Sequence, residues 1–272
     1  MRVIDAHTHI FPDKIADKAT IATAEYFDLP EPPNHHGKVQ ELLNCLAGAG
    51  IEYAMVFSAA TTEHQVEHIN RYIAQEAQAH PQFIPCGTIH AAYAAEHDFR
   101  AELAWMRAHG LHGVKIHPEF QHFNLDDERL FPVFEEMERT DMFLISHTGD
   151  PRVEVSGPER MVRVATAFPN LRCIATHLGS WGDWEAERIR PLAKLPNIYV
   201  DISSSFSYVE DKAPLLEMMA LYDPRHIFFG SDYPIWCPHK ELDKTLALGI
   251  EPGLLEDILF NNFAAFYHYR AL

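Results

Sequence analysis

The sequence has little positive charge for its length, with 22 lysine and arginine residues against 39 aspartate and glutamate residues. The resulting formal charge of −17 would repel the phosphates of nucleic acids and anionic membrane surfaces. We therefore expect a small-molecule substrate, with neither a nucleic acid nor a membrane as partner. Composition leaves open whether the chain forms a homo-oligomer.

Long apolar runs and paired cysteines are also lacking. No uncharged apolar stretch approaches membrane-spanning length, and Asp5 interrupts the N-terminus, so we expect neither a membrane helix nor a signal peptide. The four cysteines, at positions 45, 86, 173 and 237, form no Cys-x-x-Cys pair. This spacing argues against a disulfide scaffold and a thiolate zinc site, and it favours a reducing, cytoplasmic location.

Short apolar runs alternate with amphipathic helical patterns along the whole chain. The runs predict eight strands, at residues 3–10, 53–58, 83–90, 113–117, 142–148, 172–178, 198–203 and 226–232. Apolar residues at three- and four-residue spacing predict helices between them, for example at 63–80, 96–109, 129–140 and 214–222. The pattern predicts one domain over residues 1–272 with the (β/α)8 TIM-barrel fold, and a doubly wound open sheet is the alternative.

One predicted connection is much longer than the others. Residues 11–37 carry prolines at 12, 30, 32 and 33 and end at Gly37, before a helical pattern begins near Lys38. We interpret them as a long first βα loop. Because such loops surround the active site of a barrel, we expect this one to act as a lid or to contact the substrate. His35 and His36 lie in it, either as substrate contacts or as solvated loop residues.

Histidine is unusually abundant, with 18 copies. His7 and His9 are two positions apart at the end of the first predicted strand, so their side chains point to the same side and can hold one ion. About one such pair is expected by chance at this composition, so the position of the pair at a strand end is the stronger evidence.

Polar side chains also lie at the ends of four other predicted strands. They are Lys115 and His117, His147, His177, and Asp232. Burying a polar group in an apolar strand is costly unless the group is hydrogen-bonded or binds a metal, although each histidine alone is compatible with a satisfied core position. Together these groups predict a site for one divalent ion. Imidazole and carboxylate donors suit zinc, and manganese, iron and cobalt are alternatives.

Five motifs resemble, in order, the signatures of the amidohydrolase superfamily. They are IDAHTH at 4–9, GVKIHP at 113–118, HTG at 147–149, THLG at 176–179 and FGSDYP at 229–234. The resemblance is strongest to the branch that contains metal-dependent barrel hydrolases and aminocarboxymuconate semialdehyde decarboxylases. Asn262 and Ala264 resemble the C-terminal helix of that branch.

The resemblance implies which residues bind the metal ion. The implied ligands are His7, His9, His147 and Asp232. Asp232 would also act as a catalytic proton acceptor. His177 would be the second catalytic residue, close enough to contact the water or the substrate.

Two further residues are implied to bind the substrate, Lys115 and His117. In binuclear relatives a lysine at the position of Lys115 is carboxylated and bridges two metals. We expect one metal here, and a rim lysine paired with a carboxylate is an equally good interpretation of Lys115.

The sequence therefore predicts a hydrolase that cleaves an amide, ester or lactone-like bond through a metal-activated water. The alternative is nonhydrolytic decarboxylation, which needs a cation for the departing carboxylate, and Arg152 is a candidate. A noncatalytic metal-binding protein is the third hypothesis.

Overall fold

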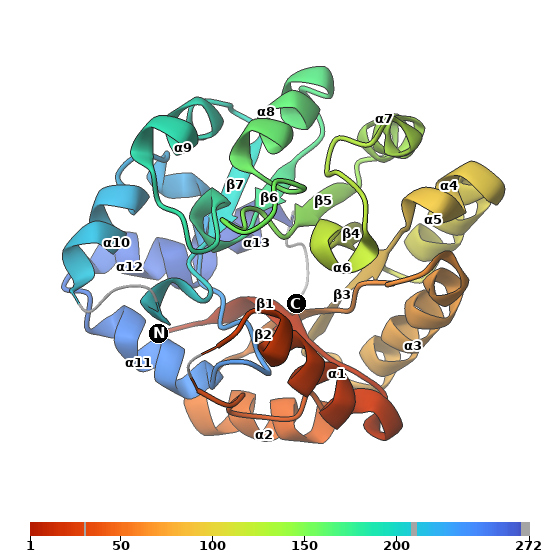
Figure 1. Cartoon of the computed structure of the whole chain (residues 1–272). Helices are drawn as coiled ribbons and strands as arrows, with labels where there is room; N and C mark the ends of the chain where they lie inside the picture. Colours follow the sequence, from red (N-terminus) through yellow and green to blue (C-terminus); the bar gives the residue numbers. More distant parts are fainter. Residues whose placement is uncertain (30, 208–210, 268–272) are drawn as a thin grey trace.

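Eight parallel strands form the centre of the molecule in a computed structural model that describes residues 1–29, 31–207 and 211–267 (Figure 1). The strands are Ile4–His9 (β1), Tyr53–Phe57 (β2), Phe83–Thr88 (β3), Gly113–Ile116 (β4), Phe143–Ser146 (β5), Cys173–Ala175 (β6), Ile198–Asp201 (β7) and Ile227–Phe228 (β8). They lie in sequence order, each hydrogen-bonded to the next. This order confirms the predicted barrel over the doubly wound sheet.

The chain closes the barrel between its first and last strands. The amide nitrogens of Ala6 and His9 donate to the carbonyl oxygens of Phe229 and Tyr233, at 2.9 and 2.7 Å. Thr8 and Tyr233 form a parallel bridge. The structure is thus a single-domain (β/α)8 barrel, in which β8 is shorter than predicted because the pairing beyond Phe228 is irregular.

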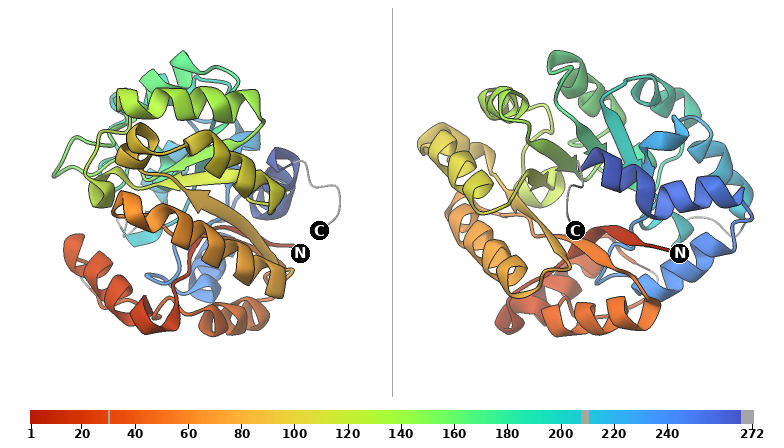
Figure 2. Two further views of the ribbon diagram at one scale, coloured as in Figure 1. Left: turned by 90° about the vertical axis from the view of Figure 1, so that its right-hand side faces the viewer. Right: turned by 180° about the vertical axis from the view of Figure 1, so that it is seen from behind.

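Helices surround the sheet on the outside and also lie at its two ends (Figures 1 and 2). They are Asp13–Tyr26 (α1), Val39–Ala49 (α2), Val66–Ala79 (α3), Ala91–Glu96 (α4), Phe99–Ala108 (α5), Pro118–Gln121 (α6), Phe131–Arg139 (α7), Pro158–Ala167 (α8), Ala186–Ala193 (α9), Lys212–Met219 (α10), Pro238–Leu246 (α11), Pro252–Glu256 (α12) and Asn262–Phe266 (α13). Figure 2 shows α1 at one end of the barrel and the N-terminus with α13 at the other. Within the described chain, no helix combines the length and apolarity needed to cross a membrane.

The interpretation of residues 11–37 as a loop is wrong for half of its length, because α1 occupies Asp13–Tyr26. Pro12 stands at the N-cap, where a missing N–H costs no hydrogen bond, and the remaining prolines follow the helix end. The residues between them lack proline and are rich in alanine, the best helix former. The segment therefore forms a helix that lies across the rim of the barrel.

A shift of register in β1 directs its histidines into the barrel. Ile4 and Ala6 belong to the apolar cluster inside the barrel, and the pairing with β2 shifts between Asp5 and Thr8. After the shift, His7 packs against Phe57 of the same cluster, with 5.2 Å between ring centroids. A bulge of this kind changes which residues face inward and so re-aims side chains.

Candidate active site

A cavity of about 220 Å³ opens at the end of the barrel where α1 lies. Strands β1, β4, β5 and β6 and the segment after β8 direct polar side chains into it, in the order of the chain: His7, His9, Lys115, His117, His147, His177 and Asp232. The predicted metal-binding, catalytic and substrate-binding residues at the strand ends therefore line one cavity. Its other walls are largely apolar.

Three of the predicted ligands form a tight group. The Nε2 atoms of His7 and His9 lie 3.2 Å apart, and the Oδ1 atom of Asp232 lies 3.4 Å from each of them. Nitrogen ligands at about 2.0–2.1 Å from a tetrahedral zinc ion lie roughly 3.3 Å from one another. The three atoms thus have the mutual spacing of ligands around a single small cation.

A second pair of facing nitrogens involves His147 and His177. The Nδ1 atom of His147 lies 3.2 Å from the Nε2 atom of His177. The other nitrogen of each ring faces a carbonyl oxygen, that of Gly149 at 2.9 Å and that of Ser203 at 3.0 Å. Because each of those outer nitrogens must donate its proton, both facing nitrogens present lone pairs. Two buried lone pairs at this distance call for a shared cation or proton, so the donor set fits a metal ion.

His147 also takes part in a separate group. Its ring stacks on that of His117 with centroids 4.2 Å apart and an interplanar angle of 7°. The carboxylate of Glu119 lies 3.1 Å from Nδ1 of His117. His147, predicted as a ligand together with His7, His9 and Asp232, thus belongs to a second group of possible ligands and not to theirs. His177 connects the groups, since its ring centroid lies 5.1 Å from that of His7 and 4.9 Å from that of His147.

Burial sets the protonation of these groups. It lowers the pKa of the His7 ring to about 4, with the nearby Lys115 ammonium acting in the same direction. It also holds the pKa of His147 well below its usual range. Burial alone would raise the pKa of Asp232, but the histidines around that carboxyl more than offset the effect and hold its pKa well below normal. Neutral imidazoles beside a carboxylate are the forms that bind a metal.

Lys115 lies at the bottom of the cavity and is fully buried. Its Nζ atom finds no hydrogen-bond partner within the described chain and lies 4.8 Å from the ring centroid of Phe57. Burial lowers the pKa of this amine to about 8, although the carboxylates of Asp201 and Asp232 favour the charged form. The interpretation of Lys115 as a rim lysine paired to a carboxylate is therefore wrong, because it is buried and unpaired.

Arg152 does not line the cavity. Its guanidinium binds the Asp150 carboxylate, at 2.6 Å for the closest pair of atoms, and donates to the carbonyl oxygen of Tyr26. Its suggested role as the cation for a departing carboxylate therefore has no support in this geometry.

The α1 segment forms much of the apolar wall. Phe11, Thr23, Phe27 and Leu29 line the cavity together with alanines of α1. His35 and His36, in contrast, are not among the lining residues. His36 instead pairs with the carboxylate of Glu41, at 2.9 Å. His36 is thus a solvated loop residue, whereas His35 is partly buried against the ring of Tyr233, and neither lines the cavity.

Sequence reasoning missed two site residues at and just after the end of β7, Asp201 and Ser204. Asp201 is fully buried, and its Oδ2 atom accepts a hydrogen bond from Nδ1 of His7, at 3.0 Å. Ser204 donates to the Oδ2 atom of Asp232, at 2.6 Å, and accepts from the indole nitrogen of Trp236, at 2.8 Å. The available signal for Asp201 was a carboxylate within the apolar predicted strand 198–203, similar to the signal of Asp232 at the end of the predicted strand 226–232.

Comparison with known proteins adds a family to this geometry. A family model described as "Amidohydrolase" matches residues 4–269. A comparison with curated proteins finds no match.

Several solved structures are similar over nearly the whole chain. An uncharacterized TIM-barrel protein from Bordetella bronchiseptica has a TM-score of 0.79 at 22% identity, covering 98% of this chain and 99% of that one. A 5-carboxyvanillate decarboxylase from Sphingomonas paucimobilis has a TM-score of 0.72 at 16% identity, with coverages of 98% and 99%. A probable 2-pyrone-4,6-dicarboxylic acid hydrolase from Acinetobacter baumannii has a TM-score of 0.71 at 14% identity, with coverages of 99% and 100%. At these identities the likeness concerns the fold.

Proposed function

Because this chain belongs to the amidohydrolase family, we propose that it is a metal-dependent hydrolase that cleaves an amide, ester or lactone-like bond of a small molecule. The observation that carries the proposal is the group formed by the Nε2 atoms of His7 and His9 and Oδ1 of Asp232, at 3.2–3.4 Å from one another. Such spacing of neutral imidazoles and a carboxylate suits one divalent ion.

The ion would be held by His7, His9, His147 and Asp232, with zinc as the proposed metal. When bound, a divalent ion supplies Lewis acidity and lowers the pKa of water toward neutrality. Four free cysteines fit a cytoplasmic setting for the reaction.

Asp232 is the proposed proton acceptor in hydrolysis. Its Oδ1 atom faces His7 and His9, whereas its Oδ2 atom is held by the Ser204 hydroxyl. The hydrogen bond from Ser204 keeps the carboxylate from rotating, so that Oδ1 stays directed at the reacting water. Asp232 takes the proton of that water and passes it to the leaving group.

His177 is the second catalytic residue. Its Nδ1–H donates to the carbonyl oxygen of Ser203, which leaves Nε2 as an acceptor toward the cavity. To stabilise the negative charge that develops on the substrate oxygen, the ring must first take up a proton at Nε2 from solvent, and it returns that proton to solvent when the product leaves.

The cavity indicates what kind of molecule fits. Phe27, Phe120 and Trp181 offer aromatic walls, and among the lining residues of the described chain Lys115 is the one lysine or arginine. A compact substrate with a planar or apolar body and one anionic group matches this arrangement, with the anion on Lys115. His117 stacks beside His147 and contacts the same substrate.

Decarboxylation is the second candidate, and the state of Lys115 favours it. A buried ammonium without a partner can bind a carboxylate. When that carboxylate leaves as carbon dioxide, the electron pair of the broken carbon–carbon bond takes up a proton at the substrate carbon, and the amine is available for the next substrate. The structurally similar proteins include a decarboxylase and a probable hydrolase.

A substrate screen distinguishes the two reactions. The zinc-loaded protein is incubated with lactones, amides and aromatic carboxylic acids while acid release and carbon dioxide are recorded separately. Acid release without carbon dioxide supports hydrolysis, and carbon dioxide release supports the lyase. If neither product forms with any compound and the protein still binds metal, the noncatalytic hypothesis gains support instead.

A further inference from the structure

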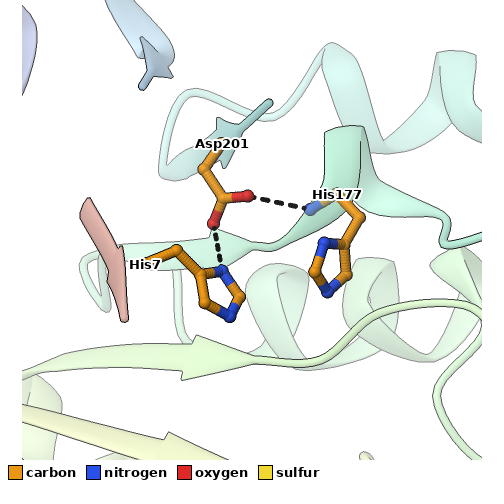
Figure 3. Close-up of side chains that lie close together, drawn as sticks. All are labelled: His7, His177 and Asp201. Atoms are coloured by element: carbon orange, nitrogen blue, oxygen red, sulfur yellow. Dashed lines mark hydrogen bonds and ion pairs between the residues drawn. The ribbon is translucent and has the colours of Figure 1, made fainter. Parts of the chain in front are cut away.

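Strand β7 contributes none of the proposed metal ligands, yet its last residue lies directly behind two of the site histidines. Asp201 is completely buried and sits between His7 from β1 and His177 from the turn that follows β6 (Figure 3). One carboxylate oxygen faces the ring of His7, and the other faces the backbone nitrogen of His177 (Figure 3).

Every donor around Asp201 can be assigned. Oδ2 accepts from Nδ1 of His7 at 3.0 Å. Oδ1 accepts from the backbone nitrogens of His177 and Ser203, each at 3.1 Å, and from the Ser203 hydroxyl. Because N–H and O–H groups occupy both oxygens, the carboxylate binds protein donors rather than a cation. The proximity of its oxygen to both histidines therefore does not make a second metal site.

These bonds determine which nitrogen of each ring carries its proton. An ionised carboxylate is an acceptor only, so Nδ1 of His7 must be the protonated nitrogen and Nε2 must carry the lone pair. In His177, Nδ1 faces the carbonyl oxygen of Ser203 at 3.0 Å, and the lone pair again lies at Nε2. Both Nε2 atoms point away from Asp201, to the same side (Figure 3).

We propose that Asp201, supported by Ser203, is a positioning residue that fixes the tautomer and orientation of His7 and anchors His177 at the same time. One buried carboxylate would thus hold a metal ligand and a catalytic histidine in register, although His7 belongs to β1 and His177 follows β6. The inference rests on the proposed function for the role of the two histidines. Carboxylates that bind the far nitrogen of a metal-bound histidine typically change metal affinity by about 10–100-fold.

Metal affinity gives the first test. Zinc binding to the full-length protein is measured by competition with a chromogenic chelator for wild type, Asp201→Asn, Ser203→Ala and the control Glu102→Gln. Glu102 is also a buried carboxylate, but it binds Arg71 and Asn70 on the outer side of the barrel. We expect Asp201→Asn to weaken zinc binding about 10–100-fold, Ser203→Ala about 5-fold, and Glu102→Gln not at all.

Tautomer state gives a second test that needs no metal. In the metal-free protein with ¹⁵N-labelled histidine, long-range ¹H–¹⁵N NMR reports which ring nitrogen of His7 is protonated, with His7→Gln identifying the signal. We expect Nδ1–H in the wild type and a mixture of tautomers in Asp201→Asn. If that variant does not fold, the same change of the His7 tautomer is looked for in Ser203→Ala.

Two results would overturn the inference: wild-type zinc affinity in folded Asp201→Asn, or an unchanged His7 tautomer in that variant. A wild type that binds no zinc while its His7 tautomer depends on Asp201 would refute the proposed metal chemistry and leave the positioning role standing. The two failures are therefore distinguishable.

Discussion

The two ends of the barrel interior are built from opposite kinds of residue. At the end near α13, the interior is closed by aromatic rings such as Phe143, Phe228 and Phe266, which pack edge to face with centroids 5.0–5.3 Å apart. At the end beneath α1, the interior holds imidazoles, carboxylates and an ammonium group around a cavity. The aromatic end gains free energy from apolar burial, whereas the polar end incurs the cost of burying charge.

Left-handed backbone angles outside glycine are more frequent at the polar rim than at the aromatic end, where Asp141 before β5 has one. His177, Leu178, Ser204 and Asp232 all follow strand ends at the polar rim, and their φ angles are 59°, 55°, 57° and 62°. Such left-handed angles are unfavourable for residues other than glycine and occur where the surrounding structure enforces them. The rim is therefore specialised for placing side chains, and the opposite end supplies the stability that this requires.

The largest expected effect comes from the aromatic end. Phe143→Ala should lower the free energy of unfolding by about 3–5 kcal/mol, because it removes a buried ring and leaves a cavity. Zinc stoichiometry at temperatures where the variant is folded should not change. Denaturant unfolding and elemental analysis measure the two quantities. Loss of zinc from the folded variant would show that the two ends are not independent.

At the rim, His177→Asn should lower turnover about 100-fold, the usual contribution of a general acid–base group. Unfolding free energy and zinc content should stay close to those of the wild type. Steady-state kinetics on a substrate from the screen, with metal analysis of the same sample, checks both. Loss of zinc would instead place His177 among the metal ligands, which its 3.2 Å contact with His147 allows.

Lys115→Met should stabilise the metal-free protein at pH 7 by about 1–3 kcal/mol, since a side chain of similar volume replaces a buried, unpaired ammonium. In the wild type, the pKa of Lys115 is lowered from 10.5 to about 8 by burial, so the unfolded chain binds more protons between these values. The free energy of unfolding of the wild type should therefore increase relative to that of the variant as pH rises from 8 to 10.5. Urea titrations at pH 7 and pH 10 measure this difference. Equal stability of the two proteins at both pH values would contradict the account.

The smallest effect is expected from the wall that α1 contributes. Phe27→Ala should raise KM several-fold or alter the preference among substrates, because its ring lies 4.5 Å from that of Trp181 in the cavity wall. Shortening residues 28–36 should act in the same direction without loss of zinc. An exposed substitution on the same helix, Ile21→Ala, is the control. If both variants kept wild-type kinetics, residues 27–36 would not contact the substrate and would not form a lid.

The sequence predicted the order of elements better than the details of the rim. All eight strands were expected, because apolar runs between amphipathic helices are the direct consequence of a barrel covered on its outside. The predicted ends extended past β6 and β8, since Leu178 and Phe229 continue the apolar pattern after the ladder ends. Helix α1 was missed because the prolines around it were given more weight than the alanines within it.

Two geometric features of the site could not be predicted from the sequence pattern. His7 and His9 were expected on one side of a regular strand, yet a register shift in β1 is what directs them inward. The distance between the rings of His147 and His177 likewise depends on the turns after β5 and β6. The seven candidates at the strand ends line one cavity, whereas Arg152, His35 and His36 do not, and the proposed roles remain predictions.

Metal content tests the central claim most directly. The wild type and His9→Ala are purified, stripped with a chelator, incubated with zinc or manganese and analysed for bound metal, with circular dichroism as the control for folding. The account predicts about one ion per wild-type chain and a loss of most of it in a folded His9→Ala protein. A wild type that takes up neither metal would contradict it.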